Sequence, residues 1–464
     1  MKRRELIAML LCLLIISNIA TYIFTRFFFS PTVLEVEVPG QREESGLFWE
    51  VWNILDGRYF QPLEEKELMR GAIKGMLESL NDPHSAYLTP ESFQELLIHA
   101  TGSLSGIGVE IVEDEGEILI LRVIKDSPAQ RGGLSEGDRI VEVDGRRGLL
   151  LDEAVQLLRG PSGTTVNVVV RRLGEQQLLP FDLKRADIEM DTVFSRMIED
   201  GIGYIQITSF DQDTGKDFLN ALALLEENNL RGLIFDLRSN PGGLADEAIE
   251  VGKVIVPSGE ITRVVDRSGN IQERFYSEAE KKDYKIVVLV NEYTASAAEI
   301  IAGALQDREK ALLIGLPTFG KASMQYLQFL SDGGGLRYTI AKYLTPSGGD
   351  WHGRGLTPDF EVTLPDEYYL QYQFVPGNLK PGDTGERVIQ LQKMLTFLGY
   401  PVKTTGLFDD QTVNSLMEFQ RINKLVPTGS LENSTREHLR SGLSEKAAEV
   451  DNQLQYAVDI LKGK

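Results

Sequence analysis

The sequence has very little cysteine and histidine. It contains one cysteine, Cys12, and four histidines in 464 residues. A single cysteine cannot form a disulfide within the chain, and so few thiols and imidazoles leave little material for a zinc site. We therefore expect no metal and no organic cofactor, and a fold held together by packing.

Basic residues are scarce relative to acidic ones. The chain has 48 Lys and Arg against 69 Asp and Glu, which gives a formal net charge of −21. This charge repels nucleic acid and anionic lipid head groups, so no nucleic-acid partner is expected. The hydrophobic content of 42% is ordinary for globular protein, and the chain is too long for a single core. Several domains are predicted.

Long apolar runs are absent except at the amino terminus. Residues 6–25 carry no charge, and basic residues flank them at 2–4 and at Arg26. This is the length of a membrane-spanning helix, and the leading basic residues place the amino terminus in the cytoplasm. A cleaved signal peptide is the alternative, but its apolar region is shorter and ends in small residues, whereas residues 27–29 are phenylalanines. We predict a cytoplasmic stub and single-pass anchor at 1–30, with the catalytic part outside the cell membrane.

The secondary-structure pattern of the sequence changes several times along the rest of the chain. Phe48, Val51, Trp52 and Leu55 recur at helical spacing, as do the apolar residues of 68–80. Their faces are compatible with a homodimer surface or with burial against their own core. Short β runs follow around a helix at 151–159, and strands then alternate with helices as in an α/β layer. The predicted divisions are an N-terminal helical segment (46–101), a β-rich module (102–187), an α/β core (188–375), a helical module (377–442) and a terminal helical segment (443–464).

Two strand-to-helix junctions carry residues suited to catalysis. Residues 236–243 read Asp-Leu-Arg-Ser-Asn-Pro-Gly-Gly, whose glycines allow backbone N–H groups to approach a developing oxyanion; a plain tight turn is the alternative. Small residues surround Ser296 where a strand at 286–290 meets a helix N-terminus, which supplies N–H donors and the positive end of the helix dipole. Ser296 is therefore a candidate nucleophile or, alternatively, a helix cap.

A serine nucleophile needs a base, and lysine fits this sequence better than histidine. Three histidines fall in the helical flanks, and His352 lies in a glycine-rich loop without an evident carboxylate to orient it. Lys321 follows a buried strand, 25 residues beyond Ser296. An amine stays neutral near pH 7 only when burial disfavours its charge. We expect Lys321 to be buried without a carboxylate salt bridge; the alternative is a surface lysine in a turn.

Together these segments resemble the carboxyl-terminal processing, or tail-specific, proteases. That family has Asn-Pro-Gly-Gly, then Ser-Ala-Ser-Ala-Ser-Glu, then Thr-Phe-Gly-Lys-Gly-x-x-Gln, and the resemblance covers about residues 46–372. Thr294 and Ala298 here replace serines and Ala322 replaces a glycine, and none of these touches the proposed dyad. The resemblance implies an α/β, crotonase-like ββα core and a serine endopeptidase that needs no cofactor.

The resemblance also implies a role for each site residue. Ser296 would be the nucleophile, Lys321 the general base and Gln325 the group that orients the lysine. The oxyanion-hole N–H groups would come from Gly243 and Ala297. Supporting residues would be Arg238, Gly242, Glu299, Asp307 and Thr318.

The module at 102–187 resembles a PDZ domain inserted before the protease core. Its carboxylate-binding loop would grip the C-terminus of a protein or peptide substrate, which adds to the domain as a strand. Arg159, ahead of a Gly-Pro-x-Gly turn, is a hypothetical regulatory residue that would transmit peptide binding to the active site. The peptide-binding residues would be Gly106, Ile107, Gly108 and Val109.

Residues 377–442 resemble a small all-α peptidoglycan-binding module. Residues 443–464 resemble the terminal helix of the protease itself, so the wall-binding module would be an insertion. We interpret the sequence as a membrane-anchored, extracytoplasmic serine endopeptidase with protein C-termini and peptidoglycan as partners. The alternatives are a non-catalytic, wall-bound PDZ scaffold and a peptidoglycan hydrolase, which would want a metal cluster or paired carboxylates that we do not find.

Overall fold

The computed structural model describes residues 41–463 except 94–95, 97–103, 115, 173, 189–190, 200, 309–310, 374 and 376. The predicted anchor at 1–30 lies outside the described residues. Within them, no helix has the length and apolarity needed to cross a bilayer. By its contacts the chain divides into two units, residues 1–75 and 76–464.

The described part of the first unit is helical. It comprises helix α2 (Gln41–Arg58) and most of helix α3 (Glu65–Glu78). On α2 the ring centroids of Phe48 and Trp49 lie 5.2 Å apart, and those of Trp49 and Trp52 lie 6.0 Å apart. Trp49 is 52% exposed, so α2 presents a large apolar surface to solvent.

The β-rich module forms a sheet around one buried core. Strand β7 shows why: Val166, Val168 and Val170 are fully buried, whereas the residues at its two ends are exposed, which is the period-two pattern of a half-buried strand. Helices α5 (Pro128–Gly132) and α6 (Leu151–Leu158) accompany the sheet, and β2 (Leu104–Gly106) pairs with β9 (Ala186–Ile188). The strand order is β3 (Val109–Asp114), β4 (Glu117–Val123), β5 (Arg139–Val143), β7 (Thr165–Arg171), β8 (Leu179–Lys184), with β6 (Arg146–Arg147) beside β5.

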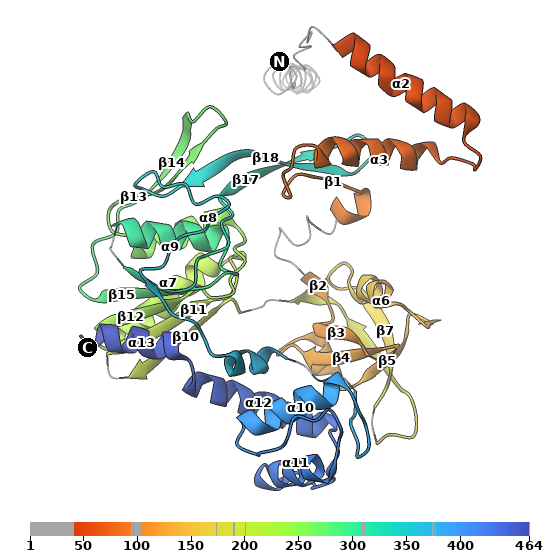
Figure 1. Cartoon of the computed structure of the whole chain (residues 1–464), viewed down its shortest axis with the longest axis vertical. Helices are drawn as coiled ribbons and strands as arrows, with labels where there is room; N and C mark the ends of the chain where they lie inside the picture. The colour runs from red at the N-terminus through yellow and green to blue at the C-terminus, as the bar shows by residue number, and fades with distance from the viewer. Residues whose placement is uncertain are drawn as a thin grey trace, which may run out of the picture. The chain divides into compact units, whose positions relative to one another are not determined.

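The strands and helices of the core alternate along the chain, as predicted for an α/β fold, and helices pack on both sides of the sheet (Figure 1). Its strands run parallel except for the first pair, and alternate residues face opposite sides. Leu233 and Phe235 pack in the cluster that includes helices α7 (Thr214–Glu227), α8 (Ala245–Ile255) and α9 (Ala297–Arg308). Ile234 packs with α13 (Asn452–Leu461) on the other side. The strand order is β10 (Val193–Glu199), β11 (Ile202–Ile207), β12 (Gly232–Asp236), β15 (Lys285–Val290), β16 (Leu312–Gly315), β19 (Phe360–Glu361).

A second, antiparallel sheet, which the sequence did not predict, adjoins this core. In it β17 (Ser323–Phe329) and β1 (Ala86–Leu88) both pair with β18 (Gly335–Leu344). Strand β13 (Gly259–Val265) pairs with β18 and with β14 (Ile271–Ser277). Through β1, residues near position 85 join this second sheet.

The C-terminal region differs from the prediction in two respects. Helices α10 (Glu386–Phe397) and α11 (Asp410–Ile422) were expected, but α12 (Asn433–Glu449) was not. The predicted terminal helix at 447–461 is wrong as a single element, because the chain breaks after α12 and restarts at α13. Val450 is the C-cap of α12, and Asp451 is the N-cap of α13, its side chain accepting the N–H of Leu454 at 2.9 Å. A 3-10 helix, η1 (Asp366–Tyr372), precedes the module.

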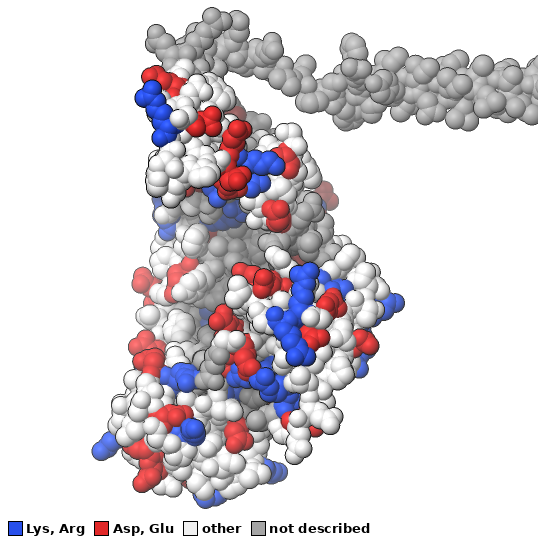
Figure 2. Space-filling view, turned by 90° about the vertical axis from the view of Figure 1, so that its right-hand side faces the viewer, with Lys and Arg blue, Asp and Glu red and all other residues white. Residues whose placement is uncertain are grey.

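Charged side chains of both signs are mixed on the surface. Figure 2 shows acidic and basic side chains interspersed over the face that it draws. In the β-rich module the interspersion includes ion pairs, such as Arg172 with the buried Asp138 at 2.7 Å. On the face drawn, the acidic surplus therefore does not gather into a patch of one sign.

Candidate active site

The turn after β12 is fixed by a buried asparagine. Asn240 is fully buried; its side-chain amide donates to the Ile207 carbonyl, and its side-chain oxygen accepts the N–H of Gly242, both at 2.8 Å. Gly243 forms a parallel bridge with Phe210 and has φ +140°, and a Cβ there would lie 2.2 Å from the Phe210 oxygen. Only glycine fits this position.

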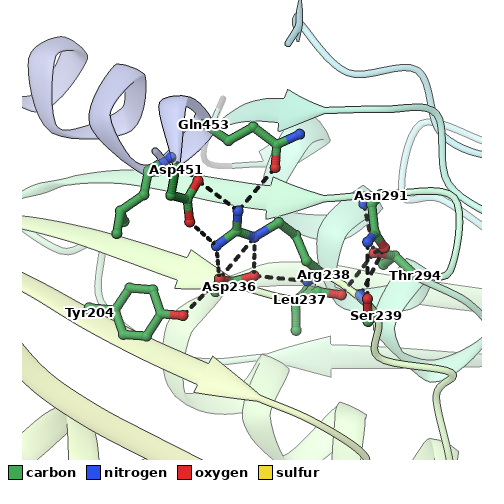
Figure 3. A network of polar contacts seen from close by, with 10 residues as sticks. Tyr204, Asp236, Leu237, Arg238, Ser239, Asn291, Thr294, Asp451 and Gln453 are labelled. Carbon is green, nitrogen blue, oxygen red and sulfur yellow. Dashed lines mark hydrogen bonds and ion pairs between the residues drawn. The ribbon is translucent and has the colours of Figure 1, made fainter. Parts of the chain in front are cut away.

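This turn is tied to the loop that precedes α9 (Figure 3). The N–H of Ser239 donates to the Asn291 side-chain oxygen at 2.8 Å, and the Thr294 hydroxyl donates to the Leu237 carbonyl at 2.8 Å. The N–H of Ala295 donates to the Asn240 carbonyl at 2.9 Å. The threonine that departs from the family pattern therefore joins the two loops.

Ser296 lies immediately before α9 in an unusual backbone conformation. Its φ is +56°, a left-handed value that costs energy in a residue other than glycine. Its N–H donates to Glu299 Oε2 at 2.8 Å, whereas its hydroxyl makes no hydrogen bond with any described residue. The hydroxyl therefore does not cap the helix, and Glu299 does so instead.

Two backbone N–H groups in the loops around Ser296 have no acceptor among the described residues. A Cβ on Gly242 would lie 2.8 Å from Ser296 Cβ and 3.0 Å from the Ala297 nitrogen, so the turn packs directly on the serine. The bridge with Phe210 uses the Gly242 carbonyl and the Leu244 N–H. The N–H groups of Gly243 and Ala297 find no acceptor among the described residues. Such unpaired donors near a hydroxyl can stabilise an oxyanion.

Glu299 joins the serine to the lysine loop. Its carboxylate is fully buried, and Oε1 accepts the Thr318 hydroxyl at 2.6 Å and the Gly320 N–H at 2.7 Å. Oε2 accepts the N–H groups of Ser296 and Lys321, each at 2.8 Å. A buried carboxylate needs such partners. Two of these four donors are the backbone N–H groups of Ser296 and Lys321, so the Glu299 side chain binds both predicted catalytic residues.

Lys321 is half-buried and forms no ion pair with any described residue. Burial is the main cause that lowers the pKa of its amine, and the charge of Arg337 lowers it further. Asp82 and Glu299 act in the opposite direction and only partly offset this. Because its pKa is lowered, a larger fraction of Lys321 carries a neutral amine at a given pH. No hydrogen bond joins Lys321 Nζ to the Ser296 hydroxyl.

Two further predicted residues, Gln325 and Asp307, form hydrogen bonds with other segments. The Gln325 amide donates to the Ser323 hydroxyl at 2.8 Å and to the Thr339 hydroxyl at 3.4 Å, and not to Lys321. Asp307, near the other end of α9, accepts the N–H of Ser347 at 2.8 Å. Gln325 and Asp307 therefore support neighbouring segments.

Arg238 belongs to a separate buried network (Figure 3). Its guanidinium lies between Asp236 and Asp451, with N–O distances of 2.6 Å and 2.8 Å. Gln453 accepts a further bond at 3.1 Å, and the Tyr204 hydroxyl donates to Asp236 at 2.7 Å. The network fastens the start of α13 to the end of β12.

Sequence reasoning missed the turn at 81–85. From the sequence, this region is predicted to belong to the N-terminal helical segment, and His84 to be one of the histidines in the helical flanks. In the structure β1 pairs with β18, and the charge of Lys321 lowers the pKa of His84, after the larger effect of burial. The short apolar run that follows the turn, Ala86–Leu88, was the one available signal of a strand.

The predicted peptide-binding loop lines a cavity of about 280 Å³ in the β-rich module. Gly108 has φ +79°, and a Cβ there would lie 2.3 Å from the Ser127 side chain. Arg159 and Ile188 also line the cavity, so it reaches both the end of α6 and the end of β9.

Comparison with known proteins gives four family matches. They are peptidase family S41 (201–362), a PDZ domain (119–172), a putative peptidoglycan binding domain (384–439) and the N-terminal domain of the activating protease CtpB (14–92). Carboxy-terminal processing protease CtpA of Bacillus subtilis is 39% identical over 87% of this chain and 87% of its own length. CtpB of the same organism is 32% identical over 87% and 86%. Among solved structures, a photosystem II D1 C-terminal processing protease is 30% identical, covering 70% of this chain and 95% of its own, with a TM-score of 0.44.

Proposed function

The chain belongs to the carboxy-terminal processing proteases of peptidase family S41, and from this premise we propose that it cleaves peptide bonds with a Ser296/Lys321 dyad. It is a serine peptidase with a PDZ domain and a peptidoglycan-binding domain. The observation that carries the dyad is the Glu299 carboxylate, which accepts the N–H groups of both residues at 2.8 Å.

The proposed reaction begins with proton transfer from the Ser296 hydroxyl to the neutral Lys321 amine. Ser296 Oγ then bonds to the substrate carbonyl carbon, and the N–H groups of Gly243 and Ala297 stabilise the oxyanion. The C–N bond breaks as Lys321 returns the proton to the leaving amine. Water, deprotonated by the same amine, hydrolyses the acyl-enzyme. The first transfer needs the two side chains within hydrogen-bond reach, and in proteases without substrate this contact is often long.

We further propose that the PDZ domain selects substrate C-termini with an apolar last residue. The groove supports this because Ile107 and Val109 line the cavity beside Gly108. Arg159, on the same cavity, is the proposed transmitter of peptide binding. Peptidase activity that is unchanged in Arg159→Ala would remove it from this role.

The cellular setting is likewise a proposal. An anchor at 1–30 would hold the enzyme at the outer side of the cell membrane, and the helical module would bind the cell wall. The exposed aromatic residues of α2 support a homodimer.

Cleavage of casein by the purified full-length chain tests the dyad. Ser296→Ala and Lys321→Ala should each lower the rate by at least about a thousandfold, because the acting groups of such a unit depend on one another. Ser268→Ala, at an exposed position of the β13–β14 hairpin, and Lys253→Ala, on the exposed face of α8, are matched controls that should cleave normally. Cleavage by all variants at the wild-type rate would discard the dyad.

A further inference from the structure

The turn missed in the sequence is held by its own carboxylate. Asp82 accepts the N–H of His84 at 2.9 Å and the hydroxyl of Ser85 at 2.6 Å. Burial alone would raise the pKa of Asp82, but the bonds from Ser85, Thr339 and His84 outweigh it and hold that pKa below its usual value. Asp82 therefore carries its negative charge at neutral pH.

Strand β18 connects this turn to the lysine loop. Ser85 Oγ accepts the N–H of Thr339 at 3.1 Å, and Arg337 Nε donates to the carbonyl of His84 at 3.0 Å. On the other side of β18, Thr339 stands opposite Gln325 of β17, whose amide reaches the Thr339 hydroxyl. Hydrogen bonds thus run from the turn to the strand that follows the lysine.

Charged groups from three elements act electrostatically on the Lys321 amine. Arg337 comes from β18, Asp82 from the turn and Glu299 from α9. After burial, Arg337 is the charge that lowers the pKa of Lys321, whereas the two carboxylates raise it. Glu299 accepts four hydrogen bonds that hold the two loops, so its substitution would change the structure as well as the charge. Arg337 and Asp82 are therefore the two charges that variants can remove to test the electrostatic effect.

His84 adds a titratable neighbour to the same group. Its pKa is lowered by burial and then by Lys321, with smaller effects in the same direction from His352 and Arg337. Only Asp82 opposes this. Neutral His84 adds no charge near the amine, which leaves Arg337 and Asp82 as the opposed pair at the pH where the lysine works.

We propose that Asp82 and Arg337 are positioning residues of the active site, which hold one negative and one positive charge beside the Lys321 amine. Each acts through the lysine and is held at the turn, Asp82 by the Ser85 hydroxyl and Arg337 by the carbonyl of His84. The proposal rests on Lys321 being the general base. Because the charges are opposite, their removal has opposite consequences, which a merely structural role would not produce.

The test is kcat/KM against pH for the full-length chain with a short fluorogenic peptide. A lysine base acts when neutral, so kcat/KM rises with pH through its titration. Arg337→Gln removes a charge that disfavours the ammonium, and the rising limb should move to higher pH. Asp82→Asn removes a charge that favours it, and the limb should move to lower pH. Each shift should be about half a pH unit, with KM unchanged.

Controls separate charge from structure. Arg337→Lys and Asp82→Glu keep the charges and should keep the wild-type limb, and they serve also if a neutral variant does not fold. Asp266→Asn removes a carboxylate that accepts backbone N–H groups in the β13–β14 turn and should leave the limb unmoved. Limbs that stay in place, or that move in the same direction in both neutral variants, would overturn the proposal. Wild-type activity in Lys321→Ala would instead overturn the dyad itself.

Discussion

The Glu299 side chain connects the loop that carries Ser296 to the loop that carries Lys321. Its carboxylate accepts three backbone N–H groups and one hydroxyl while fully buried. Backbone donors cannot be replaced by mutation, so any substitution at Glu299 leaves some of them unpaired. The spacing of the serine loop and the lysine loop depends on this acceptor.

Glu299→Gln should lower both stability and activity. The amide keeps one acceptor oxygen and turns its NH₂ group toward backbone donors, and each buried donor left without an acceptor costs about 1–3 kcal/mol. We expect a loss of this size in urea unfolding and a fall in peptidase rate of at least about tenfold. Glu250→Gln, on the exposed side of α8, is the matched control and should change neither. A fully active, fully stable Glu299→Gln enzyme would contradict the assigned role.

At this scale the sequence indicated some site residues and could not indicate others. The small residues around Ser296 and the position of Lys321 after a buried strand are local signals. Asp82 has no such signal, because it reaches the lysine only through the pairing of β1 with β18, about 250 residues along the chain. The partners of Gln325 were also out of reach, since they depend on the β17–β18 register.

Helix α13 is held to the protease core by packing and by a buried ion network. Ala457 and Val458 pack against the apolar side of the parallel sheet. At its first turn, Arg238 bridges Asp451 to Asp236 of β12. The two carboxylates are almost completely buried, and among the described residues this guanidinium is the cation that pairs with both.

Arg238→Ala should weaken the attachment of α13 to the protease core. It leaves two buried carboxylates without their cation, and removing one partner of a buried ion pair costs about 3–5 kcal/mol. In Arg238→Ala, amide hydrogen exchange in α13 should be faster than in the wild type. Exchange in α7, which packs in the cluster on the other side of the sheet, should change less. Arg274→Ala, which breaks a more exposed pair with Glu260, should leave exchange in α13 as it is. Unchanged protection of α13 in Arg238→Ala would show that packing alone holds the helix.

Element prediction succeeded where periodicity was strong. The buried strands of the α/β core and the alternating strands of the PDZ domain carry their own patterns. The second sheet was missed because its strands β14 and β17 are largely exposed and carry mixed side chains. The break between α12 and α13 was missed because a capping aspartate at 451 looks like any polar helix residue in the sequence.

At the scale of the whole molecule, helix α2 exposes a cluster of aromatic and aliphatic side chains. Trp49 and Val51 are exposed beside other aromatic side chains, and patches of this kind mark interaction sites. The net charge of −21 opposes self-association, so a dimer must depend on apolar contact.

Trp49→Asp should convert a dimer into a monomer. A charge in the centre of an apolar interface is strongly unfavourable. Light scattering of the purified full-length chain in detergent should give the mass of two chains for the wild type and of one chain for the variant. Leu178→Asp, at an exposed position of the PDZ domain, should remain dimeric. A monomeric wild type would exclude the homodimer.

The central claim is that Ser296 is a nucleophile activated by Lys321. The most direct measurement is mass spectrometry of the full-length chain after reaction with a fluorophosphonate, which labels activated serines. We predict one adduct, on the peptide that contains Ser296, and labelling at least about a hundredfold slower in Lys321→Ala. An adduct on another serine, or equal labelling rates in the two proteins, would contradict the claim.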